Sequence, residues 1–283
     1  MTPDHDVVPL HVLGTDVDVR VTGREPQELA GVLRERWHLA LRDGAEPGRT
    51  ADEGPSGTLV VEAGVVLPGD QPTPWARHEA SVHDRDLPRL LQRLTQTITH
   101  AVITARTGEL LMLHAAGLAD PATGATAAFV APGNTGKTTL CRALGPGRAY
   151  VSDETVGIRR DGTITPYLKP LSTRRPDWTG TKDEQPPGAA GLTAPAAPPW
   201  IAGVVVLRRE ADHPGPPRVE ELDLLDAVLA LTPESSGVMR TAGPLQWLAD
   251  VLERTGGARR VVYAEAAHLE PLAAQIWDRS NPW

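Results

Sequence analysis

The chain has 283 residues, of which 40% are hydrophobic and 23% are charged, as in an ordinary soluble globular protein. This length accommodates one large domain or two smaller ones. The formal charge of −8 argues against a nucleic-acid coat, because such a coat needs a clustered basic face. Since no apolar run is long enough to cross a membrane and the first residues do not resemble a signal peptide, we expect a cytoplasmic protein without a membrane partner.

The first third of the sequence predicts a small α+β region without a chemical motif. Apolar residues at helical spacing predict a helix from Glu25 to about Leu41. Runs of alternating apolar residues favour β-strands, the first two joined near Gly14, at residues 7–13, 17–21 and 59–63.

The clearest helix of the sequence closes this region. Asp86 is a good N-cap and Pro88 suits a first helical turn. Leucine, isoleucine and valine then recur every three or four positions, and Gly108 is placed to end the helix. We therefore expect an N-terminal α+β region at residues 1–108 and a second, motif-bearing region at residues 109–283.

A strand, a glycine-bearing loop and a helix follow one another early in the second region. Two apolar runs, residues 110–118 and 125–130, predict antiparallel strands around a turn. The second strand leads into Ala-Pro-Gly-Asn-Thr-Gly-Lys-Thr at residues 131–138, and residues 138–144 favour a short helix. That helix contains Cys141, the only cysteine, which we expect to be a small buried side chain and not half of a disulfide.

The rest of the chain alternates between strands and helices, with one interruption. Residues 170–199 contain seven prolines, which predicts a long irregular segment of the kind that forms a lid or a binding loop. Elsewhere the sequence predicts strands at 149–151, 201–208 and 260–264, a hairpin over 156–166, helices at 222–231 and 245–252, and a last helix at the end.

Lysine is rare in this chain, which makes Lys137 informative. Only three of the 28 basic residues are lysines, Lys137, Lys169 and Lys182, so arginine serves wherever a cation suffices. An ammonium is a compact point charge, whereas a guanidinium is a wide planar fork, so a retained lysine indicates a need that arginine does not meet. In the 131–138 motif, Lys137 has the position that reaches the β- and γ-phosphates of a nucleotide.

The same motif predicts a nucleotide-phosphate site. Backbone N–H groups of such a loop hydrogen-bond phosphate oxygens, and the N-terminus of the following helix adds its positive end. The Thr138 hydroxyl has the position that ligates Mg²⁺, and alanine replaces the usual first glycine. The residues expected to bind ATP are Ala131, Gly133, Asn134, Thr135, Gly136, Lys137, Thr138 and Thr139.

Two acids and a histidine are the other candidates for chemistry. Asp153 and Glu154 follow the strand after the loop and helix, where an open α/β sheet presents side chains to a ligand. Two adjacent acids can divide the work, one holding Mg²⁺ and one accepting a proton from an attacking hydroxyl, and a solvated strand end is the alternative. His114 lies within an apolar strand, where a histidine is more often a satisfied core residue than a catalytic one.

The order of these segments resembles the catalytic domain of HPr kinase/phosphorylase and its homologues. Leu113-His114-Ala115, the sequence APGNTGKTT, a short helix and the segment from Tyr150 to Val156 follow one another with nearly the spacing of that family. The resemblance covers residues 110–160 well, residues 200–275 loosely and the N-terminal region not at all. It implies a mixed-sheet α/β P-loop domain akin to phosphoenolpyruvate carboxykinase.

The resemblance also implies roles for the candidate residues. His114 and Asp153 would assist proton transfer from the acceptor hydroxyl, while Lys137, Thr138 and Glu154 would handle the phosphates and Mg²⁺. The acid pair is Asp-Glu where the family has Asp-Asp, and the family's downstream signature segment and arginine loop have no counterpart here, so the resemblance does not predict HPr as the acceptor or the reverse reaction. Diverged relatives accompany peptide-modification pathways, and some phosphorylate serine-type hydroxyls.

Lys169 is a candidate on the acceptor side. It lies between a predicted strand and the proline-rich segment, where a compact ammonium could contact a transferred phosphoryl group or an anionic substrate. Together these features predict an ATP- and Mg²⁺-dependent kinase that phosphorylates a hydroxyl of a peptide, protein or small molecule, with a homo-oligomer as one possible assembly. The alternative is an ATP-binding regulatory or accessory protein without a phosphorylated product.

Overall fold

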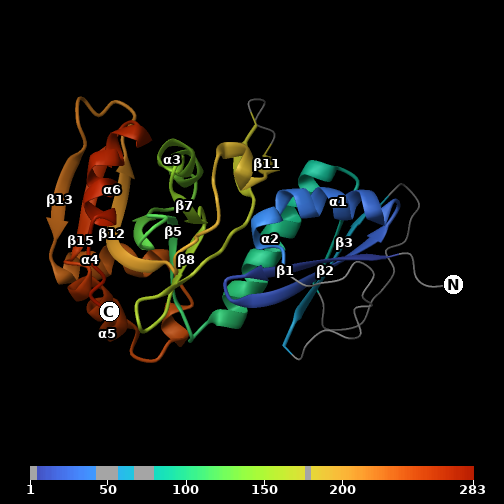
Figure 1. Cartoon of the computed structure of the whole chain (residues 1–283), viewed down its shortest axis with the longest axis horizontal. Helices are drawn as coiled ribbons and strands as arrows, with labels where there is room; N and C mark the ends of the chain where they lie inside the picture. The colour runs from blue at the N-terminus through green and yellow to red at the C-terminus, as the bar shows by residue number, and fades with distance from the viewer. Residues whose placement is uncertain (1–4, 43–56, 67–79, 176–179) are drawn as a thin grey trace. The chain divides into compact units, whose positions relative to one another are not determined.

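The computed structural model describes residues 5–42, 57–66, 80–175 and 180–283 (Figure 1). The chain divides into two compact units, and the division differs from a single boundary after Gly108. Unit 1 comprises Met1–Ala105 and Lys169–Pro187, and unit 2 comprises Arg106–Leu168 and Gly188–Trp283. Within the described ranges, no helix is long and apolar enough to cross a membrane.

Unit 1 contains a four-stranded sheet with the strand order β1-β2-β3-β4. β1 and β2 form an antiparallel hairpin, while β3 pairs in parallel with both of its neighbours. The hairpin turn places Leu13 at φ 51° and Gly14 at φ 70°, the two positive values that a tight two-residue turn between strands requires. The strands are β1 (Asp6–Val12), β2 (Thr15–Gly23), β3 (Leu59–Val65) and β4 (Ala80–Asp84).

Two helices of unit 1 confirm the helical predictions. The first is shorter than expected, since α1 (Pro26–Arg36) ends before a separate 3-10 turn, η1 (His38–Ala40). α2 (Leu87–Arg106) begins after Asp86, whose carboxylate accepts a hydrogen bond of 2.9 Å from the Arg89 N–H. The strand β4 was not predicted.

Unit 2 is built on a nine-stranded mixed sheet with helices on both faces. β12 runs parallel to β6 and β15, whereas β5 is antiparallel to β6, β7, β8 and β14. The main path has the order β13-β15-β12-β6-β5-β8-β9, so the fold is mixed α/β. The strands are β5 (Leu111–Ala119), β6 (Ala125–Val130), β7 (Ala149–Ser152), β8 (Thr155–Ile158), β9 (Ile164–Thr165), β12 (Trp200–Arg209), β13 (Arg218–Leu222), β14 (Ser235–Ser236) and β15 (Ala258–Tyr263).

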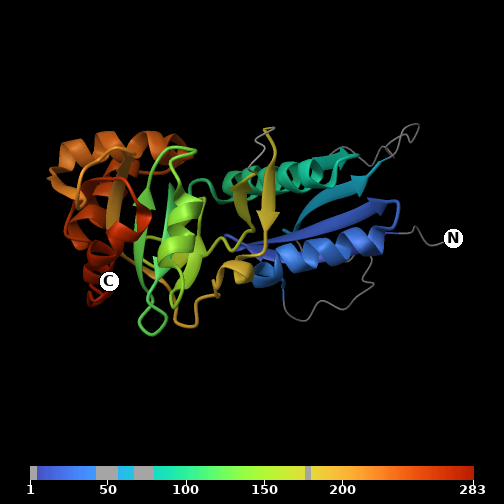
Figure 2. The ribbon, with the colours of Figure 1, turned by 90° about the horizontal axis from the view of Figure 1, so that it is seen from above.

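The helices of unit 2 cover the sheet as shown in Figure 2, where α4 and α5 lie on one face and α6 on the other. Buried side chains of α4 and α5 join the core cluster that contains Leu113 and Ala115 of β5. On the other face, the Trp277 indole N–H donates to the Leu118 carbonyl at 2.9 Å. The helical segments are α3 (Lys137–Leu144), α4 (Leu224–Leu231), η4 (Thr232–Glu234), η5 (Val238–Arg240), α5 (Pro244–Arg254), η6 (Ala266–Leu269) and α6 (Glu270–Trp277).

Most predictions for unit 2 are confirmed, including antiparallel β5 and β6, the helix α3 directly after the glycine-bearing loop, and buried Cys141 within that helix. The expectation of an irregular segment over 170–199 was wrong for two short strands and a 3-10 turn within it, whereas residues 191–199 are irregular as expected. β10 (Leu171–Arg174) and β11 (Lys182–Gln185) pair antiparallel, and η3 (Pro187–Ala190) follows. The prolines at 170, 186 and 187 flank these short strands and do not interrupt them, so the ladder keeps its N–H donors.

Candidate functional site

The glycine loop, residues 131–136, connects the end of β6 to the first turn of α3. Asn134 at φ 66° and Gly136 at φ 101° have left-handed backbones, which asparagine and glycine tolerate better than other residues. The Thr135 hydroxyl donates to the Pro132 carbonyl at 2.8 Å and fixes the curve of the loop. Because the first N–H groups of a helix have no intrahelical acceptor, the loop directs hydrogen-bond donors outward at the start of α3.

Strand β5 lies between the glycine loop and the acid pair and connects them through its backbone. The Ala131 N–H donates to the His114 carbonyl at 3.3 Å, and the Ala115 N–H donates to the Glu154 carbonyl at 3.1 Å. Two adjacent residues of one strand therefore hold the beginning of the loop on one side and the turn after β7 on the other. Residues from three separate segments of the sequence meet here.

The Lys137 ammonium is folded back onto the glycine loop. It donates to the Ala131 carbonyl at 2.6 Å and to the Pro132 carbonyl at 3.1 Å. It also lies 3.0 Å from Nε2 of His114, and the residue is 7% exposed. The lysine is therefore buried against two loop carbonyls and a ring nitrogen of His114.

His114 is the centre of the polar cluster. Its Nδ1 lies 3.0 Å from Oε2 of Glu234, and its Nε2 lies 3.5 Å from Oε1 of Glu154. Because an ammonium can only donate, Nε2 accepts the hydrogen bond from Lys137, which assigns the ring proton to Nδ1 and directs it at Glu234. The histidine is thus oriented by a carboxylate and is not simply a core residue.

Asp153 forms a second set of contacts and is 3% exposed. The Thr138 hydroxyl donates to its Oδ2 at 2.7 Å, and the Tyr150 hydroxyl donates to its Oδ1 at 3.0 Å. Burial, followed by the neighbouring Asp153 carboxylate, raises the pKa of the Tyr150 phenol well above 10.0. The phenol therefore keeps its proton and remains a donor to Asp153.

Glu154 is more accessible than Asp153, although the two are adjacent. Its side chain is 39% exposed. The turn that separates them from β8 is fixed by Ser152, whose hydroxyl oxygen accepts hydrogen bonds of 3.0 Å from the Glu154 N–H and 2.9 Å from the Thr155 N–H. The acids therefore point to different surroundings: Asp153 inward to the start of α3, and Glu154 outward beside His114.

The oxygen atoms of this cluster suit a Mg²⁺ ion that is shared with a phosphate. Within the described part of the chain, no group of three or more histidine, cysteine or acidic side chains is arranged to hold a metal. Mg²⁺ usually takes only one or two carboxylates from a protein and completes its shell with water and phosphate oxygens. The Thr138 hydroxyl and the Asp153 carboxylate, 2.7 Å apart, are hard oxygen donors of this kind and fit such an ion.

Lys169 belongs to unit 1 and takes part in a separate set of contacts. It is 1% exposed, and its ammonium donates to the Pro170 carbonyl at 2.8 Å and to the Ser172 hydroxyl at 3.3 Å. The Ser172 hydroxyl in turn donates to Glu184 at 2.8 Å. These contacts hold Lys169 against the β10–β11 hairpin, and a role on the acceptor side stays a prediction.

Sequence reasoning missed two members of the cluster, Glu234 and Tyr150. Glu234 lies 120 residues after His114, in the short turn η4, and no motif spacing connects the two. Tyr150 lies in β7, three residues before Asp153. This short spacing could have suggested from the sequence that the tyrosine contacts the acid. Only the fold could have revealed Glu234.

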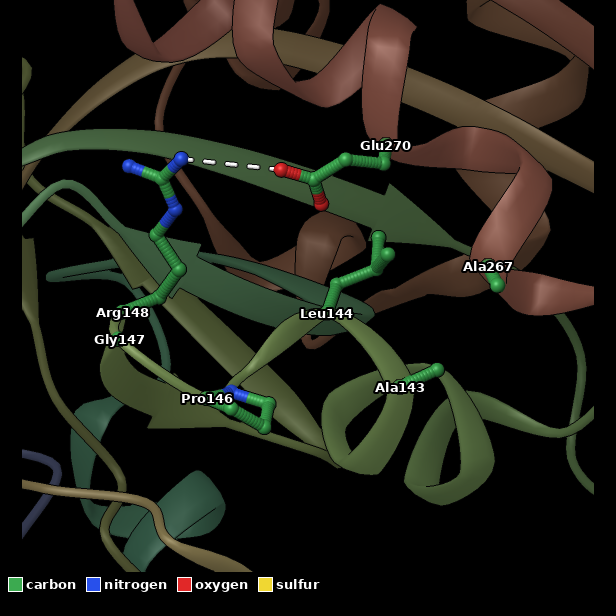
Figure 3. A pocket seen from close by; sticks show the side chains of 7 residues that line it. All are labelled: Ala143, Leu144, Pro146, Gly147, Arg148, Ala267 and Glu270. Carbon is green, nitrogen blue, oxygen red and sulfur yellow. Dashed lines mark ion pairs between the residues drawn. The ribbon is translucent and has the colours of Figure 1, made fainter.

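A pocket of about 580 Å³ lies at the opposite, C-terminal end of α3 and contains none of these residues (Figure 3). Its charged side chains are Arg148 and Glu270, 3.7 Å apart. Arg148 also lies 3.2 Å from Asp120 and stacks over the Trp277 ring at 4.1 Å. Because this arginine already meets two carboxylates and an aromatic ring, the polar cluster at the glycine loop is the better candidate for an active site.

Comparison with family models and with curated proteins finds no match to this chain. The fold defines an α/β protein with a mixed sheet, and the cluster defines a strand–loop–helix site with a buried lysine, an oriented histidine and two acids of unequal exposure. Its function is inferred below from that geometry.

Proposed function

We propose that the protein is a cytoplasmic ATP- and Mg²⁺-dependent phosphotransferase, with a P-loop domain of the HPr kinase type, that phosphorylates a hydroxyl of a peptide, protein or small molecule. The observation that carries the proposal is the 2.7 Å contact between the Thr138 hydroxyl and the Asp153 carboxylate. P-loop enzymes hold Mg²⁺ with the hydroxyl that follows the loop lysine and with an acid from a neighbouring strand. Here the hydroxyl is that of Thr138, which follows Lys137, and the acid is Asp153, which follows β7.

On the phosphate side, Lys137 and the glycine loop would bind the triphosphate. The ammonium donates to two carbonyl oxygens and lies against the His114 ring, and phosphate oxygens would offer it stronger, charge-assisted partners than these groups. Thr138 and Asp153 would hold Mg²⁺, which when bound neutralises charge on the phosphate oxygens. Asp153 stays oriented for this role because Tyr150 donates to its other oxygen.

On the acceptor side, the departure of Lys137 toward phosphate would leave Nε2 of His114 able to accept a proton. The acceptor hydroxyl would lose its proton to this nitrogen or to a nearby carboxylate as its oxygen bonds to the γ-phosphorus and ADP leaves. Glu234 would then stabilise the imidazolium through Nδ1–H, the role that a carboxylate plays behind a catalytic histidine in other enzymes. Phosphoryl transfer needs little more than such positioning and charge neutralisation.

Either Asp153 or Glu154 could be the acid that accepts the proton of the acceptor hydroxyl, and their surroundings distinguish them. The resemblance to the kinase family gives the proton-accepting role to Asp153. The geometry favours Glu154, because Asp153 is 3% exposed with both oxygens accepting hydrogen bonds, whereas the Glu154 side chain is 39% exposed and lies 3.5 Å from the imidazole. We therefore assign Asp153 to the metal and Glu154, with His114, to the acceptor.

The proposal is tested with labelled ATP in cell extract. The full chain with Mg²⁺ and γ-labelled ATP should transfer label to an extract component, and ATP with Mg²⁺ should raise its melting temperature, since a ligand at about 100 times its Kd stabilises a fold by about 2.7 kcal/mol. The Lys137→Met variant should do neither. A melting shift in the wild type without any labelled product would overturn the kinase proposal in favour of an ATP-binding regulatory protein.

A further inference from the structure

A second polar cluster, which the proposed kinase site does not use, lies on the sheet of unit 1. In the strand register, Glu62 of β3 lies opposite Ser81 of β4, and Gly64 lies opposite both Thr22 of β2 and His83 of β4. Residues directly opposite one another on neighbouring strands share a face of the sheet. The intervening residues of β3 and β4 are buried and apolar, so the cluster lies on the face opposite to them.

The cluster connects an exposed serine to a buried carboxylate through a histidine. Ser81 is exposed, and its Oγ lies 3.0 Å from Nδ1 of His83. Nε2 of the same ring lies 3.1 Å from Oε1 of Glu62, and the two side chains are 13% and 3% exposed. The Thr22 hydroxyl donates to the same carboxylate oxygen at 3.3 Å and lies 3.4 Å from Nε2.

These contacts fix where the protons lie. An ionised carboxylate can only accept, so the contact with Glu62 assigns the ring proton of His83 to Nε2. Nδ1 then has a lone pair and accepts the hydrogen bond from the Ser81 hydroxyl. A serine in contact with a base that a third group orients is the arrangement of nucleophilic catalysis. The two ring nitrogens exchange the places that they have in serine proteases, and the order of the proton path is the same.

Gly64 leaves the space that the His83 ring occupies. A Cβ atom at this position would lie 2.9 Å from Cδ2 of His83 and 2.9 Å from the Thr22 carbonyl oxygen. Carbon atoms do not approach other heavy atoms so closely without displacing them, because non-bonded atoms pack at about 3.5–4.0 Å. The ring therefore reaches both Ser81 and Glu62 only because residue 64 has no side chain.

Packing alone does not account for the two ends of the cluster. Burying the Glu62 carboxylate costs free energy that its partners must offset, whereas an apolar side chain would fill the same space without this cost. Ser81 is exposed, so water could satisfy its hydroxyl, yet the hydroxyl is directed at Nδ1 of His83. A role in chemistry requires both features.

Backbone N–H groups beside Ser81 are placed to stabilise an oxyanion. The Asp84 carbonyl accepts a hydrogen bond of 3.2 Å from the Val66 N–H, so the backbone of Asp84 points toward β3. Since successive residues of a strand point their backbone groups to opposite edges, the N–H groups of Ser81 and His83 point away from β3. Among the described strands of this sheet β4 is the last in order, and the N–H of the nucleophile is itself an oxyanion donor in serine proteases.

We propose that Ser81 and His83, with Glu62 as a positioning residue, form a second catalytic site that hydrolyses a carboxylic ester without ATP. Ser81 Oγ bonds to the ester carbonyl carbon, its proton passes to Nδ1 of His83 and then to the leaving alcohol oxygen, and the bond from carbon to that oxygen breaks. Water then attacks the acyl-serine and gives a proton through Nδ1 back to Ser81, and the carboxylic acid leaves. Glu62 stabilises the imidazolium through Nε2–H.

A fluorophosphonate probe tests the nucleophile directly, because it phosphonylates an activated serine with loss of fluoride. The full-length wild type should gain one adduct in intact mass spectrometry, and peptide mapping should locate it on Ser81. Ser81→Ala should gain none, whereas Ser280→Ala, the same change at an exposed serine of unit 2, should be labelled like the wild type. His83→Gln should lower the labelling rate about 100-fold, as expected for removal of a general base.

Turnover of p-nitrophenyl acetate tests the positioning role of Glu62. Glu62→Gln should lower kcat about tenfold or more with an unchanged KM, and Glu62→Asp should restore part of the loss. Melting temperatures show whether each variant is folded. If both Glu62 variants unfold, Ser81→Ala and His83→Gln still decide the proposal, since these two side chains are not fully buried.

Three results would overturn the proposed ester hydrolysis. The first is a wild type without an adduct, and the second is an adduct that maps to a serine other than Ser81. The third is equal labelling of the wild type and His83→Gln, which would show that the histidine does not activate the serine. None of these measurements contains ATP, so their outcome is independent of the proposed kinase function.

Discussion

Two buried lysines, one in each unit, show how similar burial can serve different ends. Lys137 is 7% exposed and Lys169 is 1% exposed. The Lys137 ammonium donates to two carbonyls of the glycine loop, in which residues 132–134 are exposed. It also lies against His114, which has the carboxylates of Glu154 and Glu234 beside it. The Lys169 ammonium donates to the Pro170 carbonyl and to the Ser172 hydroxyl. That hydroxyl donates in turn to the buried Glu184 carboxylate.

The difference lies in what surrounds each ammonium. The Lys169 ammonium donates to Pro170 and Ser172, at the start of the β10–β11 hairpin, and these two contacts indicate a structural role. The Lys137 contacts lie at the exposed start of a helix, where donors are available to an anion and where the ammonium can exchange weak acceptors for strong ones. The scarcity of lysine in the sequence drew attention to both residues, and only their surroundings in the structure distinguish a candidate phosphate contact from a structural one.

The largest expected effect comes from removing the Lys137 charge. Lys137→Met should lower ATP turnover between about 100- and 1,000-fold, because in the proposed reaction the ammonium would stabilise charge that develops on the transferred phosphoryl group. Initial rates with saturating ATP measure this, and Lys182→Met serves as the matched control with unchanged turnover. A similar loss in the control would show that any lysine of the chain matters equally.

The two acids provide the next test, since they differ in exposure. Glu154→Gln should lower kcat about 100-fold while ATP affinity stays constant, as expected for loss of a proton acceptor. Asp153→Asn should lower turnover and also remove the Mg²⁺ dependence of ATP binding, measured by calorimetry with and without the ion. If Asp153→Asn binds Mg²⁺ and ATP normally but does not turn over, the roles of the acids are reversed.

Glu234→Gln should have a smaller effect on the same reaction. Loss of the carboxylate behind His114 weakens the preference for the Nδ1–H tautomer, so kcat should fall about tenfold with an unchanged KM for ATP, and Glu234→Asp should restore part of the loss. Glu253→Gln, an exposed glutamate of α5, is the control. A rise in KM with constant kcat would indicate a binding role and contradict the positioning role.

Lys169→Met tests the other side of the comparison. Methionine keeps the buried stem but leaves the Pro170 carbonyl and Ser172 hydroxyl without this donor, so unfolding free energy should fall by about 1–3 kcal/mol. Chemical denaturation measures the loss. A fold of normal stability with a raised KM for the acceptor would instead support the predicted substrate contact.

Tyr150→Phe should cause the smallest loss of unfolding free energy, and the loss should depend on pH. The raised pKa of the phenol means that its contribution to stability is complete below pH 10.0, the ordinary tyrosine value, and is lost as pH rises above it toward the folded-state value. The wild type should therefore lose stability more steeply above pH 10 than the variant. At neutral pH the variant should be about 1 kcal/mol less stable through the lost hydrogen bond to Asp153, and parallel curves above pH 10 would contradict the assignment.

Local patterns predicted the elements that depend on near neighbours. β5, β6 and α3 follow from apolar periodicity and from the glycines between them, and the N-cap at Asp86 follows from residue type. The β10–β11 hairpin was missed because proline content was counted over a long window, although the paired residues contain none. β13 was missed because four of its five residues are exposed, which leaves no alternating apolar signal.

The candidate site divides in the same way. The sequence alone placed Lys137 and Thr138 after a strand and Asp153 and Glu154 after the next one, since these positions depend on short spacings along the chain. Tertiary structure alone decided that Asp153 is enclosed and Glu154 accessible, that Glu234 orients His114, and that Leu225 and Leu229 of α4 are exposed while Leu231 of the same helix is buried. Such facts depend on which distant segments the mixed sheet brings side by side, and no local pattern records that pairing.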